Sequence, residues 1–347
     1  MRIGTAKQTY QADEALFDTA FQRRCLIAFL ALLAVFPFAA GPYWVYLACL
    51  AAINVASATG LNILTGYTGL VSLGQAAFMG VGAYTVAWME LHLGTPFLLN
   101  LVVGGLAAGV VGMVVGVPSL RVKGLYLAIA TIAASVILHF VFANWVAVTG
   151  GPAGLTMPPA SLFGFTLDQP HELYWLILPV TVLMVWAAAN LFRTRVGRAF
   201  IAIRDRDISA EILGIPLLRY KLISFGLSSF YAGLAGGLWA YFFRVVTPES
   251  FPLLMSIFFL AAIIVGGMGT ILGGILGAVF MTLVPEALKL AVGWFSPWLP
   301  DAVALLSPLR TIVFGALIVG FLIFEPRGLV EAWRRLRRFF HLWPFRT

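Results

Sequence analysis

Charged side chains are scarce in this chain. Only 10% of its 347 residues are Asp, Glu, Lys or Arg, against roughly 25% in an average soluble domain. Hydrophobic residues make up 61% of the sequence. So few charges exclude an ordinary soluble protein, because they are too few to cover a water-facing surface. We therefore expect an integral membrane protein, an all-α polytopic bundle of transmembrane helices.

Cysteine, histidine and nucleotide-binding motifs are also scarce. The two cysteines, Cys25 and Cys49, lie in or beside apolar runs and form neither a disulfide framework nor a metal signature. The four histidines are scattered along the chain. The pattern G-x-x-x-x-G-K-[ST], which holds the phosphates of ATP, does not occur. We therefore expect no ATPase site, no metal and no cofactor on this chain.

The basic residues are clustered rather than spread. A net charge of +8 could indicate nucleic-acid binding, but the clusters flank apolar runs, where topology and lipid headgroups explain them. Membrane lipid is therefore an expected partner and nucleic acid is not. Charges and apolar runs together predict ten spans, with broken Gly-rich helices and both termini cytoplasmic. The spans cover about 25–40, 43–64, a run that follows Gln75 and ends near Glu90, 97–117, 125–148, 173–192, 222–243, two within 251–290, and 304–324.

The same charge pattern divides the chain into three parts. Residues 1–24 are predicted to be a cytoplasmic N-terminal segment, residues 25–325 the transmembrane domain, and residues 326–347 a basic cytoplasmic tail. Residues 149–172 are polar, rich in Pro and Gly and without Lys or Arg, so this loop is expected on the outside. The short turn at 121–123 is expected on the cytoplasmic side.

The most highly charged stretch is 193–221, between two apolar spans. Each of its charges would cost roughly 2.5 kcal/mol or more in hydrocarbon, so the stretch must lie in water. Its excess of positive charge places that water in the cytoplasm. The basic residues are Arg193, Arg195, Arg198, Arg204, Arg206, Arg219 and Lys221, and the acids are Asp205, Asp207 and Glu211.

Within this stretch, the segment from Arg204 to Leu213 predicts a short amphipathic helix, because it contains neither Pro nor Gly. Ile208, Ile212 and Ile215 recur at i, i+4 and i+7, which indicates one apolar side. Gly214 is a natural helix stop. One interpretation is a docking helix that offers charge and an apolar ridge to a soluble partner. The alternative is a solvated loop that only fixes the topology.

Two glycine motifs share one spacing. Paired Gly-interrupted apolar segments indicate a transport site built from broken helices. Chance matches in a Gly-rich chain are the alternative, and inverted repeats would place the motifs on opposite faces, whereas the span count places both on the cytoplasmic face. Gly66, Gly69 and Gly74 match Gly266, Gly269 and Gly274 as G-x-x-G-x-x-x-x-G, and with Ser72, Gln75 and Thr270 beside them they mark a predicted translocation path.

Two acidic residues lie within or near the ends of apolar spans. Glu286 follows Pro285 and precedes Lys289 by three positions, so it is either a functional carboxylate or half of a local ion pair. An ion-driven secondary transporter would bury such groups near mid-membrane, whereas Glu286 and Glu90 both lie near span ends. A membrane-embedded enzyme would need His, Asp or Glu clustered on facing spans, and no such cluster is evident.

Five motifs, in order between about residues 43 and 330, resemble the LivM-type permeases, membrane subunits of the branched-chain amino acid ABC importers of bacteria and archaea. This family also includes permeases for urea and short amides. The chain departs from many relatives at Gln75, where they carry His. The motifs are GYTGLVSLGQAAFMGVGAYT (Gly66 to Thr85), VPSLRVKGLYLAIATIA (Val117 to Ala133), TGGPAGL (Thr149 to Leu155), AIRDRDISAEILGI (Ala202 to Ile215) and FEPRGL (Phe324 to Leu329).

The resemblance implies an inner-membrane permease subunit of an ATP-driven importer of branched-chain amino acids, with a urea or short-amide permease as the alternative. It implies two ATP-binding subunits that carry ATP and Mg, a second, LivH-like permease subunit, and a substrate-binding protein. Importer permeases dock their ATPases through a loop with an E-A-A…G pattern. Ala210, Glu211 and Gly214 resemble that pattern in shortened form, and with Arg204, Asp205, Ile208 and Ile212 they are the predicted ATPase-coupling residues.

Overall fold

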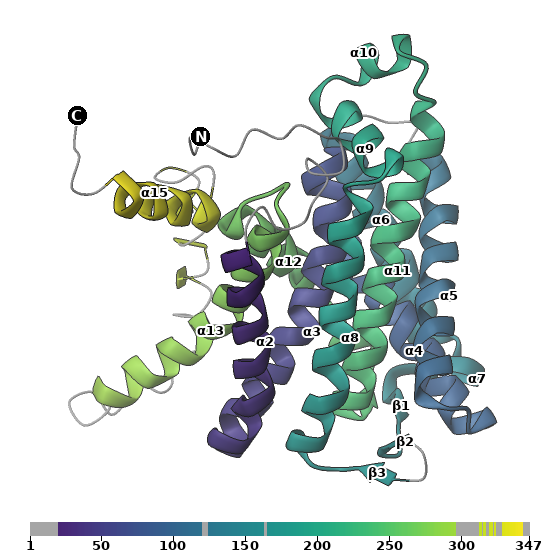
Figure 1. The fold of residues 1–347 in the computed structure, drawn as a ribbon. Helices are drawn as coiled ribbons and strands as arrows, with labels where there is room; N and C mark the ends of the chain where they lie inside the picture. Colours follow the sequence, from purple (N-terminus) through teal and green to yellow (C-terminus); the bar gives the residue numbers. More distant parts are fainter. Residues whose placement is uncertain are drawn as a thin grey trace.

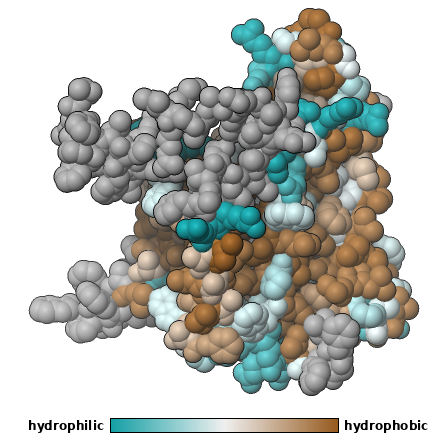
Figure 2. Space-filling view, viewed as in Figure 1, coloured by the Kyte–Doolittle hydropathy of each residue, from teal (hydrophilic) through white to brown (hydrophobic). Residues whose placement is uncertain are grey.

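The computed structural model describes residues 20–119, 124–162, 165–295 and 328–342, with further residues between 312 and 323. The long helices form a bundle, and apolar side chains cover most of its side between the two ends (Figures 1 and 2). The chain is thus a polytopic helical membrane protein, as the composition predicts. Among the described residues, seven segments are long and apolar enough to cross a membrane: Pro42–Tyr67, Phe97–Pro118, Tyr126–Asn144, Pro170–Leu191, Leu217–Phe243, Pro248–Gly266 and Ile271–Leu290.

The helices follow the apolar runs of the sequence closely. Two predicted spans, now helices α2 and α4, are absent from those seven, and α4 carries Gln75, Glu90 and His92 among its apolar residues. The turn at 121–123, residues 1–19 and most of 304–324 lie outside the described residues. The long helices are α2 (Ala20–Ala39), α3 (Pro42–Leu61), α4 (Gln75–Leu93), α5 (Phe97–Ser119), α6 (Leu125–Asn144), α8 (Pro170–Leu191), α11 (Leu217–Phe243), α12 (Leu253–Gly266), α13 (Ile271–Phe295) and α15 (Gly328–Leu342).

Shorter elements connect these helices. α3 continues directly into the π-helix η1 (Asn62–Tyr67), and α6 ends at Asn144, a few residues before the predicted end of its span. The other short elements are α7 (Val146–Thr149), η2 (Gly151–Ala153), α9 (Arg195–Asp205), α10 (Asp207–Ile212), η3 (Pro248–Ser250), and the strands β1 (Leu155–Thr156), β2 (Ala160–Leu162), β3 (Phe165–Leu167) and β4 (Val245–Val246).

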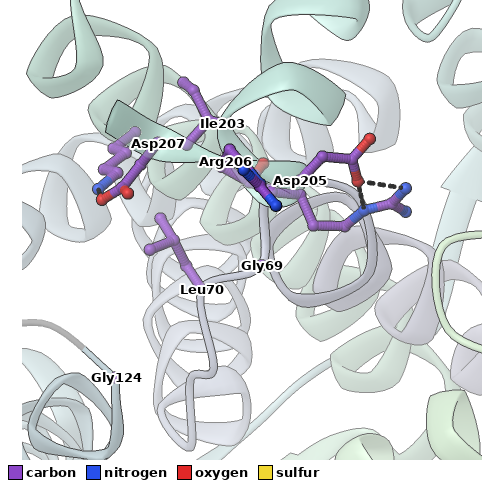
Figure 3. A pocket seen from close by; sticks show the side chains of 10 residues that line it. Gly69, Leu70, Gly124, Ile203, Asp205, Arg206 and Asp207 are labelled. Carbon is purple, nitrogen blue, oxygen red and sulfur yellow. Dashed lines mark hydrogen bonds and ion pairs between the residues drawn. The ribbon is translucent and has the colours of Figure 1, made fainter. Parts of the chain in front are cut away.

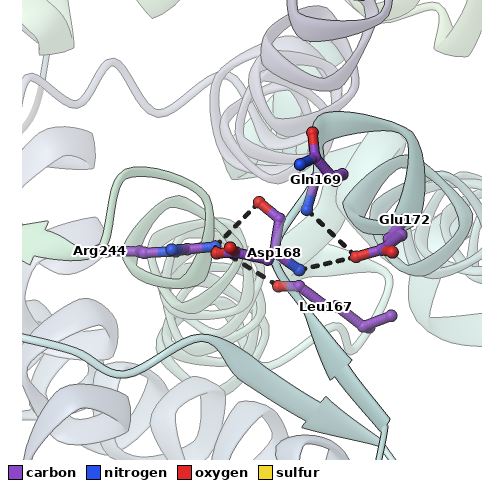
Figure 4. A network of polar contacts seen from close by, with 5 residues as sticks. All are labelled: Leu167, Asp168, Gln169, Glu172 and Arg244. Atoms are coloured by element: carbon purple, nitrogen blue, oxygen red, sulfur yellow. Dashed lines mark hydrogen bonds and ion pairs between the residues drawn. The ribbon is translucent and has the colours of Figure 1, made fainter.

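The polar loop at 149–172 contains strands that its composition does not predict. β1 pairs antiparallel with β4, and β2 pairs antiparallel with β3. This ribbon lies at the end of the bundle opposite α10 (Figure 1). Arg244 anchors the ribbon to the end of α11. Its guanidinium pairs with the Asp168 carboxylate at 2.5 Å and donates to the Asp168 carbonyl at 3.0 Å (Figure 4).

Helices α4, α5 and α11 pack through glycines. A methyl group on Gly82 would overlap the backbone of Gly233, and one on Gly236 would overlap the backbone of Met79. Likewise, a methyl group on Gly112 would overlap the side chain of Ser229. The helix backbones therefore touch with almost no side chain between them, which is the close approach that small residues permit in membranes.

Candidate functional site: the charged loop and the glycine motifs

Two short helices, not one, occupy the charged stretch 193–221. The predicted single helix from Arg204 to Leu213 is wrong, because α9 ends at Asp205 and α10 begins at Asp207. Arg206 between them is extended, with φ −158°. The Asp207 carboxylate accepts the N–H of Ile208 at 2.9 Å, which satisfies a backbone donor at the start of α10 and favours a helix boundary there.

The predicted helix stop at Gly214 is confirmed. Gly214 has φ +84°, the left-handed conformation that glycine adopts readily. Its N–H donates to the Glu211 carbonyl at 2.9 Å, and the N–H of Ile215 donates to the Ala210 carbonyl at 3.0 Å. This pair of bonds is the Schellman motif, which satisfies the last carbonyls of a helix. The E-A-A…G-like residues therefore form one compact helix end.

The tip of α10 is apolar and exposed. Ile208 is 68% exposed and Ile212 is 81% exposed. Ile215, predicted on the same ridge, lies beyond the helix end and is half-buried, whereas Leu213 is 79% exposed and was missed because it is out of phase with the i, i+4 pattern. α10 projects beyond the ends of the other helices, and its apolar tip stands out in the space-filling view (Figures 1 and 2). Ala210 is buried beneath it.

The charged residues of this loop face in different directions. Asp205 and Glu211 are exposed. Arg204 pairs with the Asp205 carboxylate at 3.0 Å, but its Nη1 also donates to the Gly66 carbonyl at 3.1 Å. Between this loop and the segment after η1 lies a cavity of about 240 Å³ (Figure 3), lined by Thr68, Gly69, Leu70, Gly124, Ile203, Arg204, Asp205, Arg206, Asp207 and Lys221.

The two glycine motifs meet in space. Gly66 lies so close to Gly269 that a methyl group on Gly66 would overlap the Gly269 nitrogen. Asn62 joins them: its Oδ1 accepts the N–H of Gly269 at 3.0 Å, and its Nδ2 donates to the Thr270 carbonyl at 2.8 Å. The structure thus gathers Gly66 and Gly269, with Gly69 and Gly266 beside them, at the α10 end of the bundle. We call this contact region the glycine junction.

Ser72 and Gln75 lie deeper than the junction. Residues 69–74 are non-helical, and α4 starts inside the bundle, where the N–H of Ala76 donates to Ser256 Oγ at 2.9 Å. The Gln75 amide donates to the Ser57 carbonyl at 2.9 Å. Ser57 lies ten residues before Tyr67, which corresponds to roughly 15 Å along a helix. The chain therefore re-enters the bundle before α4 begins, which is the geometry of a broken helix.

The sequence analysis did not single out Asn62, Ser57 or Ser228. Asn62 is 2% exposed and ties η1 to the α12–α13 turn, and Ser228 Oγ donates to Gln75 Oε1 at 3.4 Å. The sequence did contain a signal for Asn62. Its carboxamide lies one helical turn before Gly66, inside an apolar run, where all of its polar atoms need partners.

Glu90 lies near the end of α4, Glu286 lies near the end of the apolar span Ile271–Leu290, and both have partners. Glu286 pairs with Lys289 at 2.7 Å and also accepts a hydrogen bond from Tyr43, so the ion-pair interpretation is confirmed. Glu90 accepts hydrogen bonds from the Asn100 amide and the Tyr241 hydroxyl, each at 2.7 Å. Within the described ranges, no three His, Cys, Asp or Glu residues gather as a metal site.

A membrane-spanning bundle with a helix broken inside it and an apolar-tipped helix projecting from one end is an architecture typical of multi-pass membrane transport proteins. Residues 43–322 match the family described as branched-chain amino acid transport system / permease component. The chain belongs to this family, and it is a transport component rather than an enzyme.

Similar proteins include two LivM permeases and a permease of another import system. The chain is 31% identical over 341 residues to the high-affinity branched-chain amino acid transport system permease protein LivM of Escherichia coli K12, covering 91% of this chain and 77% of that protein. It is 23% identical over 313 residues to the probable LivM of Methanocaldococcus jannaschii, covering 78% and 88%. Autoinducer 2 import system permease protein LsrC of Salmonella typhi is 29% identical over 198 residues, covering 55% and 51%. No solved structure matches the chain.

Proposed function

We propose that this chain is the translocating permease subunit of an ATP-driven importer of branched-chain amino acids in the inner membrane. The similarity to LivM across 91% of the chain supports this most directly. Two ATP-binding subunits carry ATP and Mg, and one of them docks on α10 through Ile208, Ile212 and Leu213. A LivH-like second permease subunit and a substrate-binding protein complete the transporter.

The test is uptake by the reconstituted transporter. With the ATPase subunits, the second permease and the binding protein in proteoliposomes, we expect ATP-dependent uptake of leucine, isoleucine or valine. Uptake of urea or short amides instead would assign the other substrate class within the family. Uptake driven by an ion gradient without ATP would contradict the proposal.

The proposed topology has ten spans, both termini in the cytoplasm, α10 in the cytoplasm and the β ribbon outside. Ser161 in β2 and Ser209 in α10 are exposed at opposite ends of the bundle. In a Cys25→Ser background, which removes an exposed thiol, a membrane-impermeant maleimide should label Ser161→Cys in intact cells and Ser209→Cys only after lysis. Labelling of Ser209→Cys in intact cells would reverse the orientation.

The proposed translocation path follows the broken helix past Ser72, Gln75 and Thr270, because polar groups beside non-helical backbone are tolerated only where they face protein or water. Substituting each of these residues by Leu should lower uptake about tenfold, the effect of leaving a buried polar partner unsatisfied. The ATPase subunits should still co-purify. The readouts are uptake and co-purification.

Thr85→Leu is the matched control for these variants. It also replaces a partly buried hydroxyl by Leu, but Thr85 Oγ1 bonds only to the Val81 carbonyl of its own helix, at 2.7 Å. Its uptake should stay near that of the unmodified protein. Normal uptake in all three path variants would show that these positions contribute only to packing and do not line the translocation path.

A further inference from the structure

We propose that Arg204 and Asn62 form a mechanical link between the docking helix and the glycine junction. Arg204 is then a positioning residue within the permease rather than a contact to the ATPase. This inference rests on the proposed function, because it assumes that a partner moves α10. It deepens that function by naming the residues that carry the movement into the membrane domain.

Arg204 reaches across from the last turn of α9 to the end of η1. Its Nη1 donates to the Gly66 carbonyl at 3.1 Å, while Nε and Nη2 hold the Asp205 carboxylate at 3.1 and 3.0 Å. Its aliphatic part lies on Gly69, where an added methyl group would come within 3.1 Å of Arg204 Cγ. A guanidinium has enough donors in fixed directions to hold both partners at once. α9 and η1 are thereby joined.

Asn62 joins η1 to the turn between α12 and α13. Both of its amide atoms are used, one on the Gly269 N–H and the other on the Thr270 carbonyl. It is the first residue of η1, and π-helical turns inside longer helices frequently mark functional sites. One short segment, from Asn62 to Tyr67, therefore connects α3, the α12–α13 turn and α9.

The residues that form this link are in close contact. A methyl group on Gly66 would overlap both Asn62 Oδ1 and the Gly269 nitrogen, and one on Gly269 would come within 2.7 Å of Arg204 Nη1. Gly328, at the start of α15, is equally close to the backbone of Gly267. Because backbone meets backbone between η1 and the α12–α13 turn, a displacement of η1 that Arg204 passes on from α9 cannot be absorbed by side-chain rotation at this contact. It must shift the α12–α13 turn.

We assign docking of the partner to α10 and transmission of the movement to α9. α10 carries the exposed apolar tip, and the extended residue Arg206 joins it to α9. Arg204 lies on the α9 side of this joint and faces the glycine junction. A partner therefore needs to touch only α10, and Arg204 transmits the movement. Loss of its guanidinium should uncouple transport from ATP hydrolysis without detaching the partner.

The experiment compares Arg204→Met with Arg206→Met in the reconstituted transporter. Met keeps an unbranched apolar chain on Gly69 but removes the donors. For Arg204→Met we expect normal co-purification of the ATPase subunits and about a tenfold fall in substrate moved per ATP hydrolysed, in line with the loss of a charge-assisted bond. Arg206→Met, in the same exposed loop, should keep the normal ratio. Arg204→Lys should recover part of it, because an ammonium can still reach the Gly66 carbonyl.

A second variant, Asn62→Asp, tests the other half of the link. It keeps an acceptor for the Gly269 N–H and removes the donor to Thr270, so it should lower the same ratio. A normal ratio in Arg204→Met, or loss of the ATPase subunits from it, would overturn the link, the latter by making Arg204 a docking contact. Failure of the proposed function is distinguishable, because the unmodified complex would then show no ATP-dependent uptake.

Discussion

Ile212→Asp should release the ATPase subunits from the permease and abolish uptake. Ile212 is 81% exposed at the apolar tip of α10, the part of the bundle that projects furthest from this end. A central apolar anchor of an interface contributes about 2 kcal/mol or more, roughly 30-fold in affinity. Asp would also place a charge in the partner's groove, which adds to the loss. Co-purification of the ATPase subunits measures the effect directly.

Two controls accompany this variant. Asp207→Asn should be mild, since Asn keeps an oxygen that can accept the N–H of Ile208 and weakens only the ion pair between the Asp207 carboxylate and Lys221 Nζ, which are 3.9 Å apart. Leu93→Asp likewise replaces an exposed aliphatic residue by Asp. Leu93 is 57% exposed and is the last residue of α4, at the end of the bundle opposite α10. This variant should leave the ATPase subunits bound. If Ile212→Asp keeps full assembly and uptake, the stretch 193–221 only sets the topology.

Gly66→Ala should destabilise the permease and stop transport. The added methyl group would overlap Asn62 Oδ1 and the backbone nitrogen of Gly269, and a backbone atom cannot move aside as the end of a side chain can. Overpacking of this kind costs about 1–3 kcal/mol. Thermal unfolding in detergent and uptake in proteoliposomes are the measurements, and both should fall.

Gly274→Ala is the matched control, since Gly274 is the last glycine of the second motif. The nearest atom to its added methyl group, Asn62 Nδ2, would be 3.5 Å away, an ordinary contact. Its stability and uptake should therefore be close to normal. Equal behaviour of the two variants would show that the motifs do not depend on the tight contact at Gly66.

The features predicted well from the sequence are those set by neighbours in the chain. The helix stop at Gly214 depends on bonds to Ala210 and Glu211, and the transmembrane runs depend on local hydropathy. The boundary at Arg206 was missed, and Arg204 just before it bonds to Gly66, 138 positions away. Hydropathy and helix periodicity carry no information about a partner at that distance.

The glycine motifs likewise combine a feature set by neighbours in the chain with one set by distant residues. Their equal spacing is visible in the sequence, but their contact depends on Asn62, which bonds to residues more than 200 positions away. The pairing of β1 with β4 likewise joins Leu155 to Val246, so residues 149–172 alone could not predict it. Long-range pairing of this kind is fixed by the packing of the whole bundle.

The glycine packing of α4, α5 and α11 has a consequence for how the bundle can deform. Three backbones in direct contact have no layer of side chains that could repack, so they travel as a single rigid body. A smaller apolar cluster of Ala261, Ala262, Val265 and Met281 holds α12 and α13 on another face. Helix α3 contacts both α11 and α13, and deformation is therefore concentrated at the seam between α3 and the α12–α13 pair, where Asn54 of α3 bonds to Thr282 at 3.0 Å and Asn62 of η1 holds the α12–α13 turn. The seam acts as a hinge whose stiffness depends on a few hydrogen bonds, whereas the rigid body beside it acts as the lever arm.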